Sequence, residues 1–578
     1  MSNLSNQQKR FLAVSLAAFL GAFLVLMISL ASGPHVFATS HEVDFLKRLS
    51  VTPPLKTHGE KFNLFHLEVT LLFIAFVSLT AAILKDGVFI FSNFVTKHAN
   101  TFLVVLVALS VILLSSFALF VLQDFPNSAD EYAYIFQSQT FLEKRLWNEP
   151  HPVQEFFSFA HIAQIEGKWV SRFPPGWPLV LAIGSSLRIP LWLINPFLGT
   201  LSIVFLFALA RRIYNLRVAM ISVVSILFSG FFIFNSASYF SHTLCGLLII
   251  LFFYCELRFI QEDKKIYALS AGFFLGFAFI TRYYSTLLCA FPLGLHLLLQ
   301  GSPKKFTGLL WTFLGSIPFL FFTLLYNYKI TGNALLFVTT WMDPNEKLGF
   351  VDGYSWNLAW IYLVKHLQSF VYWTSPPILF LYFGYIIHSF VNKSIRSYDL
   401  PLIFIVIGYL FWHTYGGNQY GPRFYYEAYP FVILFVVARL FGETPFVTPR
   451  PFQRIALAIF LVGLVWGASA IPVMAKREHQ IISERMDLYR SVEQANIHEA
   501  IIFLKSGTGV MRPMPARDLA RNGTGFENDV LYARDLGADN AKLKAYFPNK
   551  EFYMYFRDKN KQNGRLIALE QNQKEDVH

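Results

Sequence analysis

Two adjacent carboxylates, Asp130 and Glu131, follow directly on one of the most apolar stretches of this sequence. They lie in NSADEYAYIFQSQ, and the uncharged run before them covers 22 residues, from Thr101 to Leu122. A carboxylate placed where a helix leaves the membrane can act as a general base that takes a proton from a hydroxyl group. It can also simply begin a helix, because an acid in the first turn interacts favourably with the helix dipole.

The local pattern assigns different roles to the two acids. Ser128 followed three residues later by Glu131 is a capping-box pattern, which favours a structural role for Glu131. Asp130, Tyr134 and Gln137 fall on one face of the predicted helix, so that face is polar or aromatic rather than apolar. Because acids at a membrane surface are costly to bury, this pair is a candidate reaction centre as well as a helix start.

Cations and histidines elsewhere in the sequence could complete such a site. The loop EGKWVSRFPPGWP supplies Lys168 and Arg172 beside a rigid Pro-Pro bend, either as part of an interfacial turn or as phosphate contacts. Four further ionisable residues lie near predicted outer ends of spans: His242, Arg282, His413 and Arg423. Snorkelling or simple hydrogen bonding would explain each of them alone. All four lie on the same predicted outer side as Asp130 and Glu131. Together they suggest a site for an anionic ligand next to a base.

The elements that must position these residues are membrane helices. The 578 residues are 54% hydrophobic and only 15% charged, against about 25% charged in soluble proteins. Apolar runs of about 20 residues recur, each long enough to cross a membrane. We expect about thirteen spans, near 11–31, 64–85, 101–122, 190–210, 218–234, 239–258, 267–281, 283–300, 307–327, 370–391, 399–413, 424–441 and 455–475.

The charges of the short connections predict the orientation. Lys and Arg collect on alternate loops, so the positive-inside rule places the N-terminus in the cytoplasm. The segments 123–189, 328–369 and the tail from 476 are then external, and the short apolar piece 176–187 is an interfacial or re-entrant helix. The apolar run 11–31 is expected to be a retained anchor rather than a cleaved signal. The net charge of +12 therefore needs no nucleic acid as partner.

The tail has a different composition. REHQIISERMDLYRSVEQ has helical periodicity, whereas EAIIFLKSG, DVLYARDL and FYMYFRD are typical of strands between turns. The predicted fold is an all-α polytopic membrane protein with a small C-terminal α/β extracytoplasmic domain. We expect a two-helix extension at 1–100, a catalytic membrane domain at 101–475 and the external domain at 476–578.

Several motifs, taken in order, resemble a known family. DEYAYIFQSQTFLEKRLW, GKWVSRFPPGWPLVLAIG, NPFLGTLSIVFLFALARRIY, SASYFSHTL and GGNQYGPRFYYEAYP are similar to bacterial membrane glycosyltransferases of the C-type (GT-C) fold. The most similar groups are the glycosyltransferase family 39-like or dolichyl-phosphate-mannose mannosyltransferase-like enzymes, related to the lipid A aminoarabinose transferases. The resemblance covers about residues 101–560.

This resemblance implies a sugar donor on polyprenyl phosphate, used at the outer face of the bacterial cytoplasmic membrane. It assigns the catalytic acid of the first external loop to Asp130, with Glu131 as its neighbour or substitute. It places Arg423 at the donor phosphate and Arg172 near the position of a family lysine. The acceptor would be a lipid, a glycan or a protein, and one base would give inversion at the anomeric carbon.

Three alternatives stay open at this stage. One is a transporter or flippase of a lipid-linked glycan, although no internal repeat is visible. Another is an assembly protein whose tail binds partners. A divalent cation on Asp130 and Glu131 also stays open, without a fuller ligand cluster in the sequence to hold it.

Overall fold

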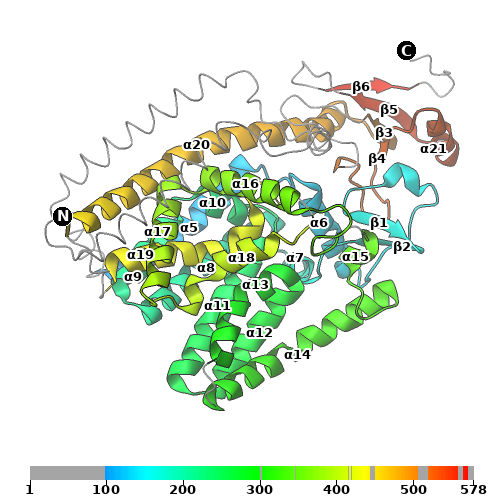
Figure 1. The fold of residues 1–578 in the computed structure, drawn as a ribbon. Helices are drawn as coiled ribbons and strands as arrows, with labels where there is room; N and C mark the ends of the chain where they lie inside the picture. Colours follow the sequence, from blue (N-terminus) through cyan, green and yellow to red (C-terminus); the bar gives the residue numbers. More distant parts are fainter. Residues whose placement is uncertain are drawn as a thin grey trace.

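The fold is described by a computed structural model that covers residues 98–299, 303–344, 346–413, 416–417, 419–442, 450–505, 518–556 and 564–569. The spans predicted at 11–31 and 64–85 lie outside these residues. Helices form a bundle, and a small sheet lies at one end of the longest helix, α20 (Arg450–Gln494), as Figure 1 shows. The expected combination of a helical membrane protein and a small C-terminal sheet region is thus confirmed.

Six helices of the described chain are long and apolar enough to cross a membrane, or seven if one bent pair forms a single span. Apolar segments in lipid become helices because every backbone amide and carbonyl must find its partner within the segment. The six are α5 (Ala99–Ser116) continued by the π-helical turn η3 (Phe117–Val121), α8 (Leu191–Ile213), α11 (His242–Glu262), α14 (Pro303–Thr331), α19 (Tyr429–Phe441) preceded by the 3-10 turn η6 (Arg423–Ala428), and α20. The bent pair is α9 (Leu216–Ile226) and α10 (Gly230–Ala237), which meet at 70°.

The prediction of about thirteen spans is therefore not matched by the described helices. Four expected spans form helices shorter than the roughly 20 residues that a span needs. They are α12 (Lys265–Thr281), α13 (Tyr283–Leu299), α17 (Pro376–Val391) and α18 (Pro401–Tyr409). Hydropathy marks a segment as apolar, but it does not tell whether lipid or neighbouring helices cover it.

The predicted first external loop, residues 123–189, contains several of the smaller elements. It begins with α6 (Ala129–Leu142) and continues through the 3-10 turn η4 (Gln154–Phe157) to a hairpin of β1 (Ile162–Ile165) and β2 (Lys168–Ser171). The strands pair antiparallel, with Ile162 opposite Ser171. The loop ends in α7 (Gly176–Ser186), whose 11 residues agree with the short helix expected there. The second segment that was predicted to be external holds α15 (Val338–Met342) and most of α16 (Trp356–Trp373), and the 3-10 turn η5 (Ser397–Asp399) precedes α18.

The C-terminal sheet has the strand order β4-β3-β5-β6. Its elements are β3 (Ala500–Leu504), β4 (Leu531–Arg534), the 3-10 turn η8 (Gly537–Asp539), α21 (Asn540–Tyr546), β5 (Glu551–Phe556) and β6 (Arg565–Ala568). β3 lies parallel to β4 and β5, while β6 lies antiparallel to β5. The helix and the three strands predicted in the tail are confirmed.

The central strand β3 shows how this sheet is joined to the rest of the chain. All five of its residues are buried, and alternate side chains point to opposite faces. Ile502 belongs to a core with Leu488 of α20, whereas Phe503 belongs to a second core with Phe156 and Phe157 of η4. One face of the sheet is therefore covered by side chains of the first external loop.

Two glycines let α12 and α14 pack closely. A Cβ atom at Gly272 would overlap the carbonyl oxygen of Thr312, and one at Gly315 would overlap that of Leu269. Small residues at a membrane helix interface let the backbones approach, which gains dispersion contacts along the pair.

We therefore expect Gly315→Ala to destabilise the protein by about 1–3 kcal/mol, because the added methyl group must push the two helices apart. The matched control is Gly294→Ala on α13, where a Cβ would have no neighbour within 4 Å. Alanine there should be neutral or stabilising, since it favours helix over glycine by about 1 kcal/mol. Thermal unfolding in detergent measures both, and equal shifts would contradict the packing argument.

Candidate active site

The start of α6 fixes the two carboxylates in different directions. Ser128 is the N-cap, and its Oγ accepts a hydrogen bond from the Glu131 backbone N–H at 3.2 Å, which confirms the predicted helix start. The Glu131 side chain is only 1% exposed, and its Oε1 accepts a hydrogen bond from the Tyr239 backbone N–H at 3.0 Å. Burial raises the pKa of Glu131 to about 7. Glu131 therefore ties α6 to the segment between α10 and α11.

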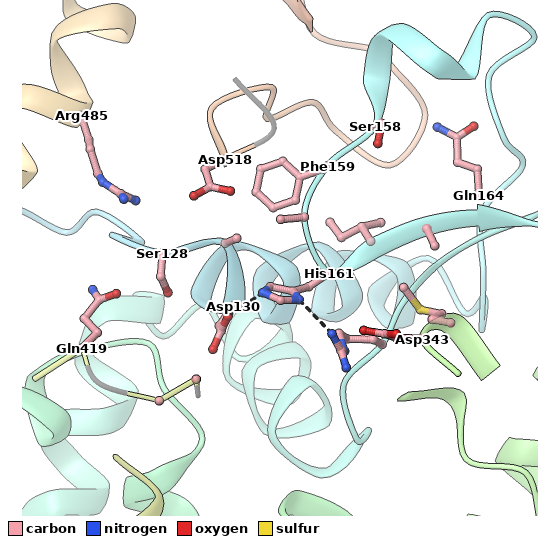
Figure 2. Close-up of a pocket in the computed structure, with 18 of the residues that line it drawn as sticks. Ser128, Asp130, Ser158, Phe159, His161, Gln164, Asp343, Gln419, Arg485 and Asp518 are labelled. Atoms are coloured by element: carbon pink, nitrogen blue, oxygen red, sulfur yellow. Dashed lines mark hydrogen bonds and ion pairs between the residues drawn. The ribbon is translucent and has the colours of Figure 1, made fainter. Parts of the chain in front are cut away.

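Asp130 faces a cavity of about 900 Å³ on the other side of the helix start, as Figure 2 shows. Its Oδ2 lies 3.0 Å from Nη2 of Arg423, and its Oδ1 lies 3.0 Å from Nε2 of His161. Burial alone would raise the pKa of Asp130. The guanidinium of Arg423 and the imidazole of His161 outweigh burial, so this pKa lies well below its ordinary value. The carboxylate is thus ionised and held by two nitrogen groups.

The turn before η6 brings Arg423 to this carboxylate. Gly421 adopts φ +98°, which disfavours any residue with a Cβ, and an added Cβ would also press on the Phe231 ring. After Pro422 the guanidinium of Arg423 lies 3.7 Å from the centre of the Phe240 ring. A cation stacked on an aromatic face and paired with a carboxylate is oriented from two sides. The segment GGNQYGPRF therefore places one fixed cation at the cavity wall.

His161 is a site residue that the sequence interpretation missed. Its Nδ1 lies 3.4 Å from Nη1 of Arg172, which itself forms an ion pair with Glu346. His161, Arg172, Asp130 and Arg423 all line the cavity. The signal in the sequence is weak, because a single histidine in the loop FFSFAHIAQ carries no spacing that points to Asp130.

Three predicted residues gather behind the cavity wall. Glu427, which is fully buried, lies 3.0 Å from Nδ1 of His242 and 3.1 Å from Nε of Arg282. Arg282 also donates a hydrogen bond to Ser241 Oγ at 3.3 Å, and the hydroxyl of Tyr134 shares that Oγ at 3.2 Å. These groups support the site from inside the bundle, and the sequence interpretation had not identified Glu427 as their shared partner.

Two predicted residues have other partners. Nζ of Lys168 donates a hydrogen bond at 2.5 Å to the carbonyl of Ile330, in the last turn of α14, and lies over the Trp147 ring. Nε2 of His413 lies 2.9 Å from the carbonyl oxygen of Gly349. Neither side chain lines the cavity. The predicted donor-binding role of Lys168 and His413 is therefore not supported by their positions, because both side chains bind backbone carbonyls elsewhere.

A divalent cation shared by Asp130 and Glu131 does not fit this arrangement. Both oxygens of Asp130 face nitrogen groups, and Oε1 of Glu131 faces a backbone amide. In the part of the chain that the structure describes, no three His, Cys, Asp or Glu side chains are grouped as metal ligands.

The C-terminal region clamps the chain just before α6. Nη2 of Arg521 donates a hydrogen bond to the Pro126 carbonyl at 2.6 Å, and Nη1 of Arg485 donates one to the Asn127 carbonyl. The Arg521 guanidinium also lies 4.5 Å from the centre of the Phe125 ring. The Tyr132 hydroxyl in turn donates to a backbone carbonyl in the same C-terminal segment. The position of Asp130 therefore depends on residues far along the sequence.

Arg521→Met keeps the aliphatic stem but removes the guanidinium from this clamp. We expect the free energy of unfolding to fall by about 1–3 kcal/mol, because a partly buried carbonyl loses a charged hydrogen-bond donor. Proteolysis in the first external loop should also become faster. Arg565→Met, at an exposed position on β6, is the control. If the Arg521 hydrogen bond did not contribute to stability, both variants would behave alike in thermal unfolding and proteolysis.

Glu131 gives a pH dependence of stability with a definite sign. Between its ordinary value of 4.5 and its folded pKa of about 7, folded Glu131 holds a proton that the unfolded chain has lost. The wild-type protein should therefore lose stability as pH rises through this window. Glu131→Gln keeps an acceptor oxygen but cannot ionise, so it should gain about 1–3 kcal/mol on the wild type between pH 5 and pH 8. If the free energies of unfolding of the wild type and of Glu131→Gln changed in parallel with pH, this assignment would be wrong.

One family model and several solved structures are similar to this chain. Residues 174–326 match the family described as "Dolichyl-phosphate-mannose-protein mannosyltransferase". No curated protein matches the chain. ArnT from Cupriavidus metallidurans, solved with undecaprenyl phosphate, is 12% identical, with 79% of this chain and 97% of that chain covered and a TM-score of 0.46. The Archaeoglobus fulgidus oligosaccharyltransferase in its apo form is 11% identical, with 69% and 62% covered and a TM-score of 0.44.

A further structure of the Archaeoglobus fulgidus enzyme, in complex with Zn and sulfate, is 12% identical, covers 78% of this chain and 67% of that chain, and has a TM-score of 0.45. The family match covers α7 to most of α14, which are the helices that follow the loop of Asp130. Through residues 174–326 the chain is similar to the dolichyl-phosphate-mannose-protein mannosyltransferase family.

Proposed function

We propose that this enzyme moves a sugar from polyprenyl phosphate to an acceptor hydroxyl in a single inverting displacement, with Asp130 as general base. The observation that carries the proposal is the Asp130–Arg423 pair in the wall of the cavity, with 3.0 Å between Oδ2 and Nη2. A base and a phosphate-binding cation must both lie within reach of the anomeric carbon, the base on the side of the acceptor oxygen and the cation on the side of the phosphate oxygen. The acceptor is a lipid, a glycan or a protein that carries a hydroxyl group.

The proposed reaction assigns one task to each member of the pair. The bond from the anomeric carbon to the phosphate oxygen breaks, and a bond from that carbon to the acceptor oxygen forms. Negative charge grows on the leaving phosphate, where Arg423 stabilises it in a poorly hydrated wall. The proton of the acceptor hydroxyl moves to Asp130. Charge and atoms balance without a further reactant.

Binding of the donor would also prepare the base. In the structure Arg423 holds the pKa of Asp130 well below its ordinary value, and so weak a base takes up a proton poorly. A phosphate that binds Arg423 competes with the carboxylate for the same guanidinium. The pKa of Asp130 then rises, because the phosphate neutralises the positive charge of Arg423 and adds a negative charge nearby. Asp130 would thus become a stronger base once the sugar donor is bound.

The proposed location is the extracytoplasmic face of a bacterial cytoplasmic membrane. Lys and Arg on alternate loops support this orientation, since the positive-inside rule predicts that the cavity lies opposite the positively charged loops. The same orientation gives a cytoplasmic N-terminus and an external C-terminal domain. Membrane lipids surround the bundle, and α5 exposes apolar residues such as Val104 and Leu109 to them.

The test is transfer from a radiolabelled polyprenyl-phosphate sugar in membranes that contain the full chain. Asp130→Asn should reduce kcat about 10²- to 10⁴-fold, because the amide cannot take up the proton. Arg423→Gln should reduce both donor affinity and kcat. Product analysis should show an inverted anomeric centre.

Asp352→Asn is the matched control, because Asp352 is an exposed loop acid that forms an ion pair with Lys347. Normal transfer by Asp130→Asn would overturn the role of Asp130. Movement of labelled lipid across the membrane without a new glycosidic bond would instead support the transporter alternative.

A further inference from the structure

We infer that His161 is a positioning residue, which keeps the Asp130 carboxylate aimed at the acceptor hydroxyl once the donor phosphate has occupied Arg423. The inference rests on the proposed function, since it concerns the same transfer reaction. It adds a residue that neither the motifs nor the family match assigns, because His161 lies outside residues 174–326.

The two oxygens of Asp130 have separate partners. Oδ2 faces Arg423, the cation that a donor phosphate would engage, and Oδ1 faces Nε2 of His161. When the phosphate draws Arg423 away, Oδ2 becomes free to accept a proton. Oδ1 still holds its bond to His161, so the carboxylate keeps its orientation. A base oriented in this way does not have to find its geometry again in every turnover.

Arg172 selects the form of the imidazole that can do this. A guanidinium only donates hydrogen bonds, so Nδ1 of His161, 3.4 Å from Nη1 of Arg172, must be the acceptor. The neutral ring then carries its hydrogen on Nε2, which donates it to Oδ1 of Asp130. Glu346 pairs with Arg172 on its other side and holds the guanidinium in place. The resulting order is Glu346, Arg172, His161, Asp130.

The backbone around His161 is built to present this ring. His161 has φ +67°, a left-handed conformation that histidine and asparagine adopt more readily than most residues. Its carbonyl accepts a hydrogen bond from the Arg172 backbone N–H at 3.1 Å, which closes the base of the β1–β2 hairpin. The ring also lies 5.5 Å from the Phe173 ring, centre to centre. In Figure 2 the labelled His161 ring points directly at Asp130.

The charged groups around Asp130 come from four elements. They are Arg423 in η6, His161 before β1, Arg172 after β2 and Glu131 on α6 itself. With Arg423 bound to phosphate, His161 is the group in direct contact that still favours the ionised carboxylate. Loss of its N–H should therefore move the acidic limb of activity to higher pH.

The experiment measures sugar transfer from a radiolabelled polyprenyl-phosphate sugar by the full-length enzyme, with kcat and donor KM recorded from pH 5 to pH 9. His161→Leu removes the hydrogen-bond donor, the imidazole N–H. His161→Gln restores an N–H that can reach Oδ1 of Asp130. His161→Asn keeps the left-handed backbone preference but is too short to reach Asp130. His498→Leu is the matched control, because His498 pairs with Asp529 in an exposed part of the C-terminal domain.

His161→Leu and His161→Asn should lower kcat about 10- to 100-fold with little change in donor KM. The acidic limb of kcat should move up by about 0.5–1 pH unit. His161→Gln should recover most of the loss, and His498→Leu should match the wild type.

Two outcomes would overturn the inference while the proposed function stands. In one, His161→Leu retains the wild-type kcat and acidic limb although Asp130→Asn is inactive. In the other, all three His161 variants lose activity equally and keep the wild-type acidic limb, which indicates only a structural role. An active Asp130→Asn enzyme would reject the proposed function itself, and the inference with it.

Discussion

The site depends on an ionised carboxylate that is kept at the edge of an apolar helix bundle. Such a charge is costly to remove from water, and it persists only where opposite charge and hydrogen-bond donors compensate the loss of hydration. Arg423 and His161 provide this compensation for Asp130. The stacking of Arg423 on Phe240, the glycine turn before η6 and the hairpin that presents His161 can all be understood as means of holding these two partners in place.

Sequence reasoning succeeded where the determinant is local. Ser128 and Glu131 are three residues apart, so the helix start could be predicted from spacing alone, and it is confirmed. The strands of the tail were predictable for the same reason, since a short apolar run between turn residues is a local property. The short helices α12, α13, α17 and α18 were overestimated as spans, because hydropathy records how apolar a segment is and not which groups cover it.

The partners of the site residues were beyond local reasoning. Asp130 and Arg423 are 293 positions apart, and only the fold brings them together. A loop cation has several carbonyls and carboxylates within reach, so residue type could not show that Lys168 binds the end of α14 while Arg423 reaches the cavity. His161 was missed because one histidine without a spaced partner gives no motif. In this chain the sequence indicated the carboxylate, and the structure was needed to identify its partners.

The shared core between β3 and η4 has a consequence for biosynthesis. Phe156 and Phe157 leave the ribosome several hundred residues before Phe503 and Phe552, with which they pack. The loop that holds Phe156 and Phe157 can therefore complete this core only after β3 and β5 have been synthesised. Assembly of the cavity is then a late event in the life of the chain, so an unfinished polypeptide inserted in the membrane has its carboxylate but lacks the arginines that hold the chain before it.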